Sequence, residues 1–173
     1  MPELWDLYDI NLRKTGQQQK RGEAIAEGLF HIVVEIWTVN EEGKLLLTKR
    51  SPNKYPFPDM WECTGGSLIA GEEPLDGARR ELFEETGIAA DKNELIFLGR
   101  TDTKTATSSR IYYNYIVYKN IWVDDIVFQE GETCDARMVT ADEFSKMCVD
   151  GIVSPSTIAR YDCFKIEKKL KGN

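Results

Sequence analysis

The sequence predicts a mixed α/β fold (α+β in some schemes) in a single domain, and three observations support this. Segments rich in β-branched and aromatic residues outnumber segments with helical spacing. The length of 173 residues matches one ordinary domain. Hydrophobic residues make up 42% of the chain and charged residues 29%, which is typical of a chain that folds around its own core. We therefore expect one domain over residues 1–173.

The first half of the chain is predicted to be mostly strands. An apolar run rich in valine, isoleucine and tryptophan and a shorter run after a polar turn have the composition of paired strands. Three prolines then predict an irregular loop. The expected elements are an N-terminal extension over 1–28 with a strand or hairpin at 4–12 and a polar loop after it, strands at 30–39 and 44–50, a turn at 40–43 and the irregular loop at 51–58.

The second half alternates helices with strands. Pro74 suits the first turn of a helix and Gly87 suits its C-terminal cap, so a helix is expected between them. Tyrosine-rich and β-branched runs then indicate strands, and apolar spacing indicates two more helices. The expected elements are helices at 74–86, 141–149 and 156–171 and strands at 95–103 and 110–122.

Charge and cysteine content exclude several classes of function. Acidic residues outnumber basic ones by 29 to 22, which argues against a protein that binds a nucleic-acid polymer through its backbone. No apolar stretch reaches the roughly 18–20 residues that span a bilayer, and the acidic N-terminus does not resemble a secretory signal. The four cysteines lack CxxC spacing, and one histidine leaves few ligands for zinc. These features predict a cytoplasmic protein with reduced thiols.

The helix at 74–86 carries an unusual group of carboxylates. Glu81, Glu84 and Glu85 fall within an arc of about 100° on one face, where they repel one another. Taken alone, such a run is usually solvated surface. The glycine pair Gly65-Gly66 lies close before the helix, however, and lets backbone approach a ligand. Anionic oxygen clusters are what hard cations such as Mg²⁺ prefer, so we favour a site for Mg²⁺ or Mn²⁺.

The segment from Gly66 to Ile88 resembles the Nudix box, G-x5-E-x7-R-E-U-x-E-E-x-G-U with U a bulky aliphatic residue, and meets every specified position. The resemblance implies an α/β/α sandwich around a mixed sheet, in which the box forms a loop, a helix and a loop. It also implies a MutT-like pyrophosphatase: a metal-dependent hydrolase that cleaves a diphosphate linkage in a nucleoside-diphosphate-type or related small molecule.

The resemblance also implies roles for individual residues. The positions that match metal ligands are Gly66, Glu81, Glu84 and Glu85. Glu81 matches a residue that is a further ligand or the base, depending on the family member. Glu72 and Arg80 match a pair that holds the loop and orients the carboxylates. Glu81, Glu84 and Glu132 are the residues expected to take part in catalysis.

The general base and the substrate contacts lie outside the box. Glu132 stands in a later loop where family members often carry a catalytic glutamate, with Glu130 as a neighbouring alternative and an ordinary loop acid as the competing interpretation. His31, Arg50 and Tyr113 are candidate substrate contacts. A lone histidine on an apolar strand is more often a core residue, and most strand tyrosines pack against the sheet.

Segments outside the box resemble the branch close to isopentenyl diphosphate isomerase, among them 3–9, 28–31, 49–51 and 61–66. True isomerases of this type place a cysteine where Gly66 stands and a histidine where Leu68 stands, and they break the box. Cys63 lies three residues too early. We therefore favour a hydrolase, with an isomerase or a non-catalytic ligand-sensing domain as alternatives. The expected partner is a small-molecule diphosphate, and because dimers are common in the family a homodimer is also considered.

Overall fold

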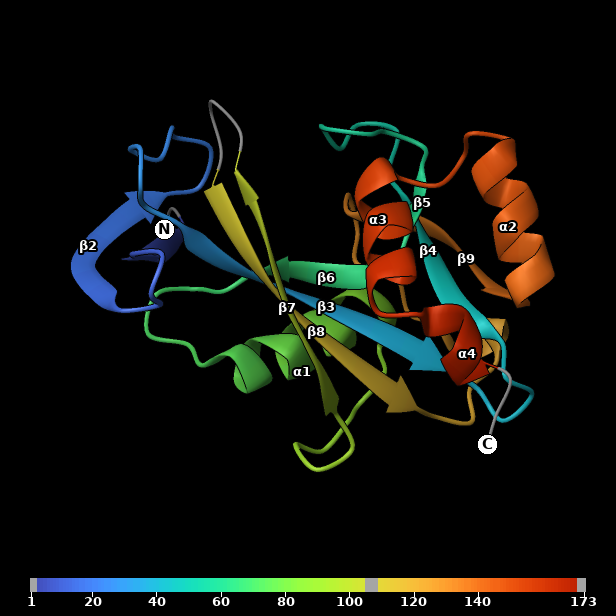
Figure 1. The fold of residues 1–173 in the computed structure, drawn as a ribbon. Coiled ribbons are helices and arrows are strands. Elements are labelled where there is room, and N and C mark those ends of the chain that lie inside the picture. The colour runs from blue at the N-terminus through green and yellow to red at the C-terminus, as the bar shows by residue number, and fades with distance from the viewer. Residues whose placement is uncertain (1–2, 105–108, 171–173) are drawn as a thin grey trace.

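The computed structural model describes residues 3–104 and 109–170. It shows a mixed sheet between two layers of helices (Figure 1). The strands are β1 (Leu4–Tyr8), β2 (Lys14–Lys20), β3 (His31–Val39), β4 (Leu45–Arg50), β5 (Trp61–Glu62), β6 (Thr64–Ser67), β7 (Ile96–Lys104), β8 (Ser109–Tyr118) and β9 (Thr133–Val139). The helices are α1 (Pro74–Thr86), α2 (Ala141–Val149), α3 (Pro155–Cys163) and α4 (Ile166–Leu170), with a 3₁₀ turn η1 (Val123–Asp125).

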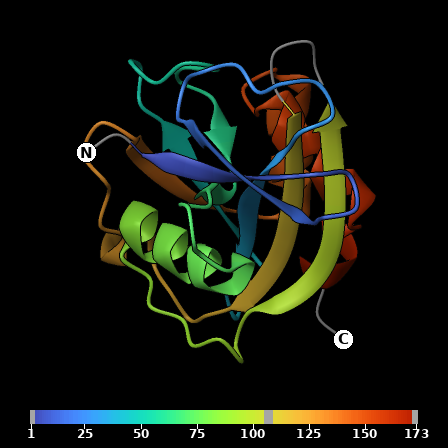
Figure 2. The same cartoon turned by 90° about the vertical axis from the view of Figure 1, so that its left-hand side faces the viewer.

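The main sheet follows the order β5-β4-β3-β8-β7, with β6 paired to β3 and β9 paired to β4. Figure 2 shows α1 on one side of this sheet and the C-terminal helices on the other. The sheet is mixed because β3 and β8 run parallel, whereas the other neighbours are antiparallel. The predicted α/β/α sandwich with a mixed sheet is therefore confirmed.

Strand β3 is the centre of the fold, and all nine of its residues are buried. Val34 and Ile36 face the core under α1, whereas Trp37 and Val39 face the core under α2, α3 and α4. A strand covered on both faces needs apolar residues at successive positions, which explains its continuous apolar run.

The sheet forks beside β3. Strand β4 pairs with β3 only at Val39 and Leu45, and then pairs with β9 and β5 instead. The short strand β6 pairs with β3 where β4 has turned away from it, with Gly66 opposite Val34 and Gly65 opposite Glu35. The fork leaves β5 and β6 beside an open cavity, described below.

Helix α1 has the predicted bounds, and its ends follow from sequence. Pro74 occupies the first turn, where its missing N–H costs nothing. Gly87 closes the helix with a φ of 75°, which a glycine adopts without steric cost, and its N–H donates to the Phe83 carbonyl. Ala78 and Leu82 are fully buried against the sheet.

Several predicted boundaries were wrong. The polar stretch predicted as a loop contains β2, which pairs with β1 through backbone bonds without apolar alternation. Strands β5, β6 and β9 were not predicted, and β8 ends at Tyr118, four residues early. The described part of the helix expected over 156–171, which leaves out residue 171, forms two helices, because Lys165 adopts a φ of 52° beside Phe164 and ends the regular turn. No helix within the described ranges is long and apolar enough to cross a membrane.

Leu82→Ala is expected to lower the free energy of unfolding by about 2–5 kcal/mol, because a fully buried side chain is removed from the core. Phe83, the next residue of α1, is 59% exposed, so Phe83→Ala should cost less than about 1 kcal/mol. Urea denaturation of both variants checks the difference. Equal losses would contradict the orientation of α1.

His31 is buried at the start of β3, and its ring stacks on Trp5 of β1 with 4.1 Å between ring centroids. Burial, assisted by the positive charge of Arg110, lowers the pKa of His31 to about 4. The side chain is therefore neutral in the folded protein at neutral pH.

Between about pH 4 and 6.5 the unfolded chain binds more protons at residue 31 than the folded chain, so this residue makes stability rise with pH across that window. Its full effect is about 3 kcal/mol. His31→Phe should keep the ring stack and remove this part of the pH dependence. The measurement is urea denaturation of both proteins at several values from pH 4 to 7. Parallel stability curves for the two proteins would refute the neutral, buried histidine.

Candidate functional site

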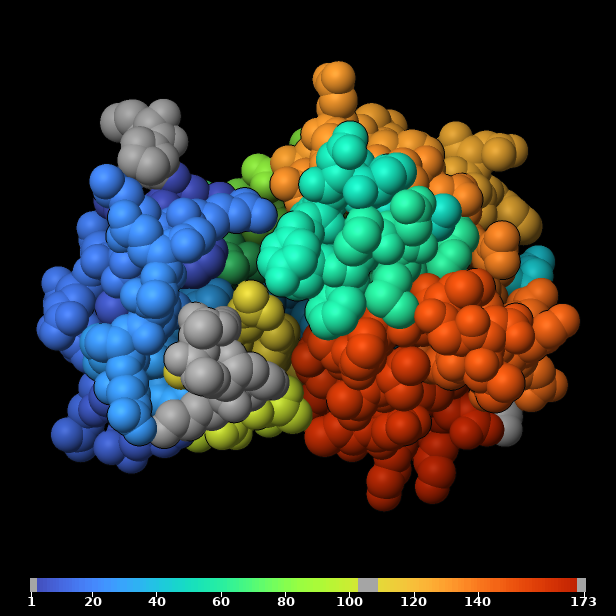
Figure 3. All heavy atoms as spheres, turned by 90° about the horizontal axis from the view of Figure 1, so that it is seen from above, coloured from blue at the N-terminus to red at the C-terminus, as the bar shows by residue number. Residues whose placement is uncertain are grey.

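Charged side chains from several parts of the chain line one open cavity of about 410 Å³ at the fork of the sheet. Figure 3 shows a hollow in the surface between the N-terminal segment, in blue, and the loop that follows β4, in teal. The lining includes residues of β3, β5, β6, α1, β8, α3, the loop at 51–60 and the loop at 129–132. Sequence segments more than 100 residues apart therefore meet in one place.

Arg80 of α1 connects most of the carboxylates that the sequence singles out. Its guanidinium donates to Glu72 at 2.9 Å, to Glu81 at 2.8 Å and to Glu84 at 2.9 Å. It also donates to the backbone carbonyl of Ser67 at 3.1 Å. One planar group with five donors thus holds the loop before α1 and two carboxylates of the helix in fixed positions.

The glycine pair of β6 lets the α1 carboxylates lie against the strand. A Cβ atom at Gly66 would stand 2.3 Å from the carboxylate carbon and both oxygens of Glu81. The N–H of Gly65 donates to Glu85 Oε2 at 3.2 Å. A residue larger than glycine at position 66 would therefore displace the Glu81 carboxylate.

Burial makes these carboxylates unusual electrostatically. Burial raises the pKa of Glu81, and it raises the pKa of Glu85 to about 8, partly offset by the nearby ammonium of Lys54. Lys54 Nζ lies 3.8 Å from Glu85 Oε1 and forms an ion pair with Glu132. The structure therefore brings Glu132 into the same cavity as the α1 carboxylates.

The donor set fits a hard divalent cation, because it consists of carboxylate oxygens beside a glycine-lined strand. The ionised form of Glu85 needs positive charge nearby, and the contact with Lys54 shows that a cation is accommodated there. Within the described ranges, no three acidic, histidine or cysteine side chains are already grouped as the ligands of an ion. Arg80 and Lys54 contact the carboxylates instead.

The opposite side of the cavity was not predicted. Arg160 of α3 donates through Nε and Nη2 to the two carboxylate oxygens of Glu35, a buried residue of β3. The Arg160 guanidinium also lies over the ring of Tyr112, 4.1 Å from its centroid. Arg110 Nη1 lies 3.4 Å from the Tyr112 hydroxyl. The sequence indicates this arrangement only through Glu35, a charged residue within the apolar run of β3.

Of the three candidate substrate contacts, Arg50 lines the cavity, and His31 and Tyr113 do not. Arg50 Nη1 donates to Glu62 at 2.6 Å. Tyr113 faces α1 and contacts Phe97, with 5.6 Å between ring centroids, while its neighbour Tyr112 faces the cavity. Alternation along a strand fixes which tyrosines share a face, but not which face is open. A role for His31 or Tyr113 in substrate binding stays a prediction.

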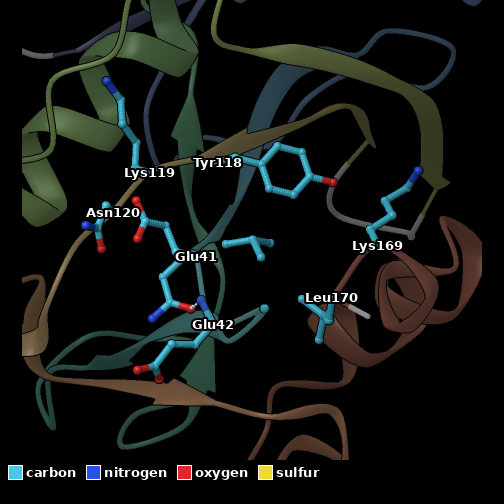
Figure 4. A pocket seen from close by; sticks show the side chains of 10 residues that line it. Glu41, Glu42, Tyr118, Lys119, Asn120, Lys169 and Leu170 are labelled. Atoms are coloured by element: carbon cyan, nitrogen blue, oxygen red, sulfur yellow. Dashed lines mark hydrogen bonds between the residues drawn. The ribbon is translucent and has the colours of Figure 1, made fainter. Parts of the chain in front are cut away.

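A second cavity, of about 390 Å³, lies where β3 and β8 end, beside the turn at 40–43 and α4 (Figure 4). Glu41, Glu42 and Lys119 lie on one side of it, and Lys169 and Leu170 come from α4. None of the predicted site residues lines it.

Comparison with known proteins identifies the family. An uncharacterized Nudix hydrolase of Listeria monocytogenes is 33% identical over 156 residues, covering 88% of this chain and 89% of the relative. An isopentenyl-diphosphate Delta-isomerase of Pectobacterium atrosepticum is 37% identical over 83 residues, covering 47% and 46% of the two chains, which supports the likeness to the isomerase-like branch. The crystal structure of a MutT protein from Methanosarcina mazei superposes with a TM-score of 0.66 at 22% identity, covering 83% of this chain and 96% of that one. Residues 29–154 match the family described as NUDIX domain, and the chain therefore belongs to the Nudix hydrolase family.

Proposed function

We propose that this Nudix hydrolase is a divalent-metal-dependent enzyme that cleaves a diphosphate linkage in a nucleoside-diphosphate-type or related small molecule. One observation carries the proposal: Glu81, Glu84 and Glu85 of α1 line the same cavity as Glu132 from a distant loop. Carboxylates that face a common opening are the expected ligands for Mg²⁺ or Mn²⁺.

Glu81, Glu84, Glu85 and Gly66 are the residues that would hold the metal. When bound, it supplies positive charge that polarises the phosphoryl group and lowers the pKa of an attacking water. Arg80 keeps Glu81 and Glu84 in place through the hydrogen bonds described above. The chain thus supplies preorganised oxygens, which need little rearrangement energy at the moment of reaction.

Glu132 is the proposed base, with Glu81 as the alternative. Glu132 is partly exposed, and Lys54 fixes its carboxylate beside the buried Glu85. From this position its oxygen can accept a proton from a water molecule at the cavity opening. Glu81, by contrast, is buried and already accepts a hydrogen bond from Arg80.

An allylic isomerase is the competing catalytic function, and the partial likeness to isomerases favours keeping it under test. The position expected for a histidine is Leu68, which is buried in the core under α1. The position expected for a cysteine is Gly66, where a Cβ would collide with Glu81. These two residues support hydrolysis over alkene protonation. A non-catalytic ligand-sensing domain remains the third alternative.

Other properties stay predictions. A small-molecule diphosphate as partner, the absence of a nucleic-acid polymer partner, a cytoplasmic location and a homodimer all rest on the sequence and the family resemblance. The four cysteines form no disulfide with one another in the structure, and their reduced state in the cell also stays a prediction.

Glu84→Gln and Glu85→Gln are each expected to lower hydrolysis by about 10²–10³-fold, because each removes a negative metal ligand while keeping side-chain shape. Phosphate release from a panel of diphosphate compounds with Mg²⁺ or Mn²⁺ is the measurement. Glu73→Gln, on the exposed residue just before α1, is the matched control. Full activity of both ligand variants would rule out the proposed metal site. Binding without turnover, or interconversion of the two five-carbon diphosphates, would instead support the alternatives.

Glu132→Gln is expected to lower kcat by about 10²–10⁴-fold, the usual contribution of a general base. Glu130→Gln, two residues earlier on an exposed position that does not line the cavity, should leave kcat unchanged. If the Glu132 variant keeps its kcat, the base is Glu81 or another group.

A further inference from the structure

The side of the cavity opposite the α1 carboxylates carries a second recognition element, which we call the arginine wall: Arg110, Tyr112 and Arg160. We propose that the arginine wall binds a further phosphate of the substrate, outside the diphosphate linkage that is cleaved. This inference rests on the proposed hydrolase function and deepens it by naming a substrate class: diphosphate compounds that carry an additional phosphate monoester.

Two residues of the wall lie on β8, which runs parallel to its neighbour β3, and the third lies on α3. Arg110 and Tyr112 lie two residues apart on β8 and therefore share a face of the sheet. Their register partners on β3 are His31 and Val33, and Glu35 follows on the same face. Val33, Glu35, Arg110 and Tyr112 all line the cavity. Ser156 and Arg160 of α3 also line it.

The guanidinium of Arg160 is fixed by Glu35 and Tyr112, and one of its three nitrogens has no hydrogen-bond partner among the described residues. The Arg160 side chain is only 7% exposed, and Glu35 takes up Nε and Nη2. The ring of Tyr112 covers the face of the guanidinium. The Nη1 of Arg160 donates no hydrogen bond to any residue of the described ranges, and Arg160 lines the cavity. A desolvated guanidinium that is fixed in advance loses little entropy when an anion binds.

Arg110 differs from the other basic residues of the cavity because it has no carboxylate partner among the described residues. Among the lining residues of the described part of the chain, every other basic side chain has a carboxylate partner. The pairs are Arg21–Glu3, Arg50–Glu62, Lys54–Glu132, Arg80–Glu81 and Arg160–Glu35. Among the described residues, the Arg110 side chain forms one hydrogen bond, to the Tyr112 hydroxyl at 3.4 Å, and no ion pair. Two guanidinium groups therefore adjoin one tyrosine, one over its ring and one at its hydroxyl, which suits a phosphate with several acceptor oxygens.

The position of the wall separates it from the α1 carboxylates. The glycine strand β6 pairs with β3, and Glu81 and Glu85 contact its two glycines from α1. Arg110, Tyr112 and Glu35 line the same cavity from β3 and β8. Because the Tyr112 ring is 5% exposed and covered by Arg160, it offers no free face for stacking a base. The wall is therefore suited to recognise charge, on a part of the substrate that extends past β6.

Matched pairs of compounds that differ by one phosphate test the inference: NAD⁺ with NADP⁺, and dephospho-coenzyme A with coenzyme A. Each contains a diphosphate linkage. With Mg²⁺, the full chain should show a kcat/KM about tenfold or more higher for the phosphorylated member of at least one pair, the usual effect of one charge-assisted contact. Arg110→Gln should reduce that ratio to near one. Arg13→Gln, on an exposed arginine that does not line the cavity, should leave the ratio unchanged.

Calorimetric binding of the same pairs in EDTA, where turnover is blocked, separates the two proposals. Two results would contradict the arginine wall but not the hydrolase proposal: hydrolysis with no preference in either pair, or an Arg110→Gln variant that slows hydrolysis of both members equally. Equal slowing would indicate that Arg110 contacts the cleaved diphosphate. A tighter Kd for the phosphorylated member that is lost in Arg110→Gln, without any hydrolysis, supports the wall and overturns the hydrolase. Neither hydrolysis nor preferential binding overturns both.

Discussion

Two buried like-charged carboxylates, Glu81 and Glu85, impose the main constraint on this fold. Taking them out of water on one helix is unfavourable unless positive charge and hydrogen-bond donors lie within reach. Arg80, Lys54 and the N–H of Gly65 supply them. The loop before α1, the glycine strand and the proline-rich loop at 51–60 each contribute one of these groups or hold it in place. The local architecture is therefore arranged around charge compensation as much as around apolar packing.

The fork of the sheet makes this compensation possible. Had β4 continued along β3, side chains of β4 would fill the place where Gly65 and Gly66 lie. Instead β4 turns to β9, and the gap admits carboxylates from α1 on one side and the arginine wall on the other. Pairing with β9 also carries the loop that holds Glu132 toward the cavity, since that loop ends where β9 begins.

The sequence predicted what local patterns encode. The bounds of α1 and α2 follow from helical periodicity and from caps such as Gly87, and the grouping of Glu81, Glu84 and Glu85 follows from the same periodicity. The contact between Glu35 and Arg160 joins residues 125 positions apart, and no local pattern specifies such a pair. Glu35 within a buried strand did signal that a partner must exist, but the partner's identity depends on how α3 docks.

The acidic residues near α1 do not give the cavity a large negative charge, because basic side chains from other segments line it as well. The segment at 72–85 contains six acidic and two basic residues, and it includes the three glutamates that were predicted to bind a divalent cation. In the folded chain the cavity lining contains seven acidic and six basic side chains, so its formal charge is only −1. Most of the net charge of −7 therefore lies elsewhere. Because nearly every lining charge has a partner, removing one leaves a partly buried charge unpaired, at a cost of about 3–5 kcal/mol where both are fully buried. A loss of activity after changing Arg160 or Glu35 thus reports on recognition only when the free energy of unfolding is measured beside it.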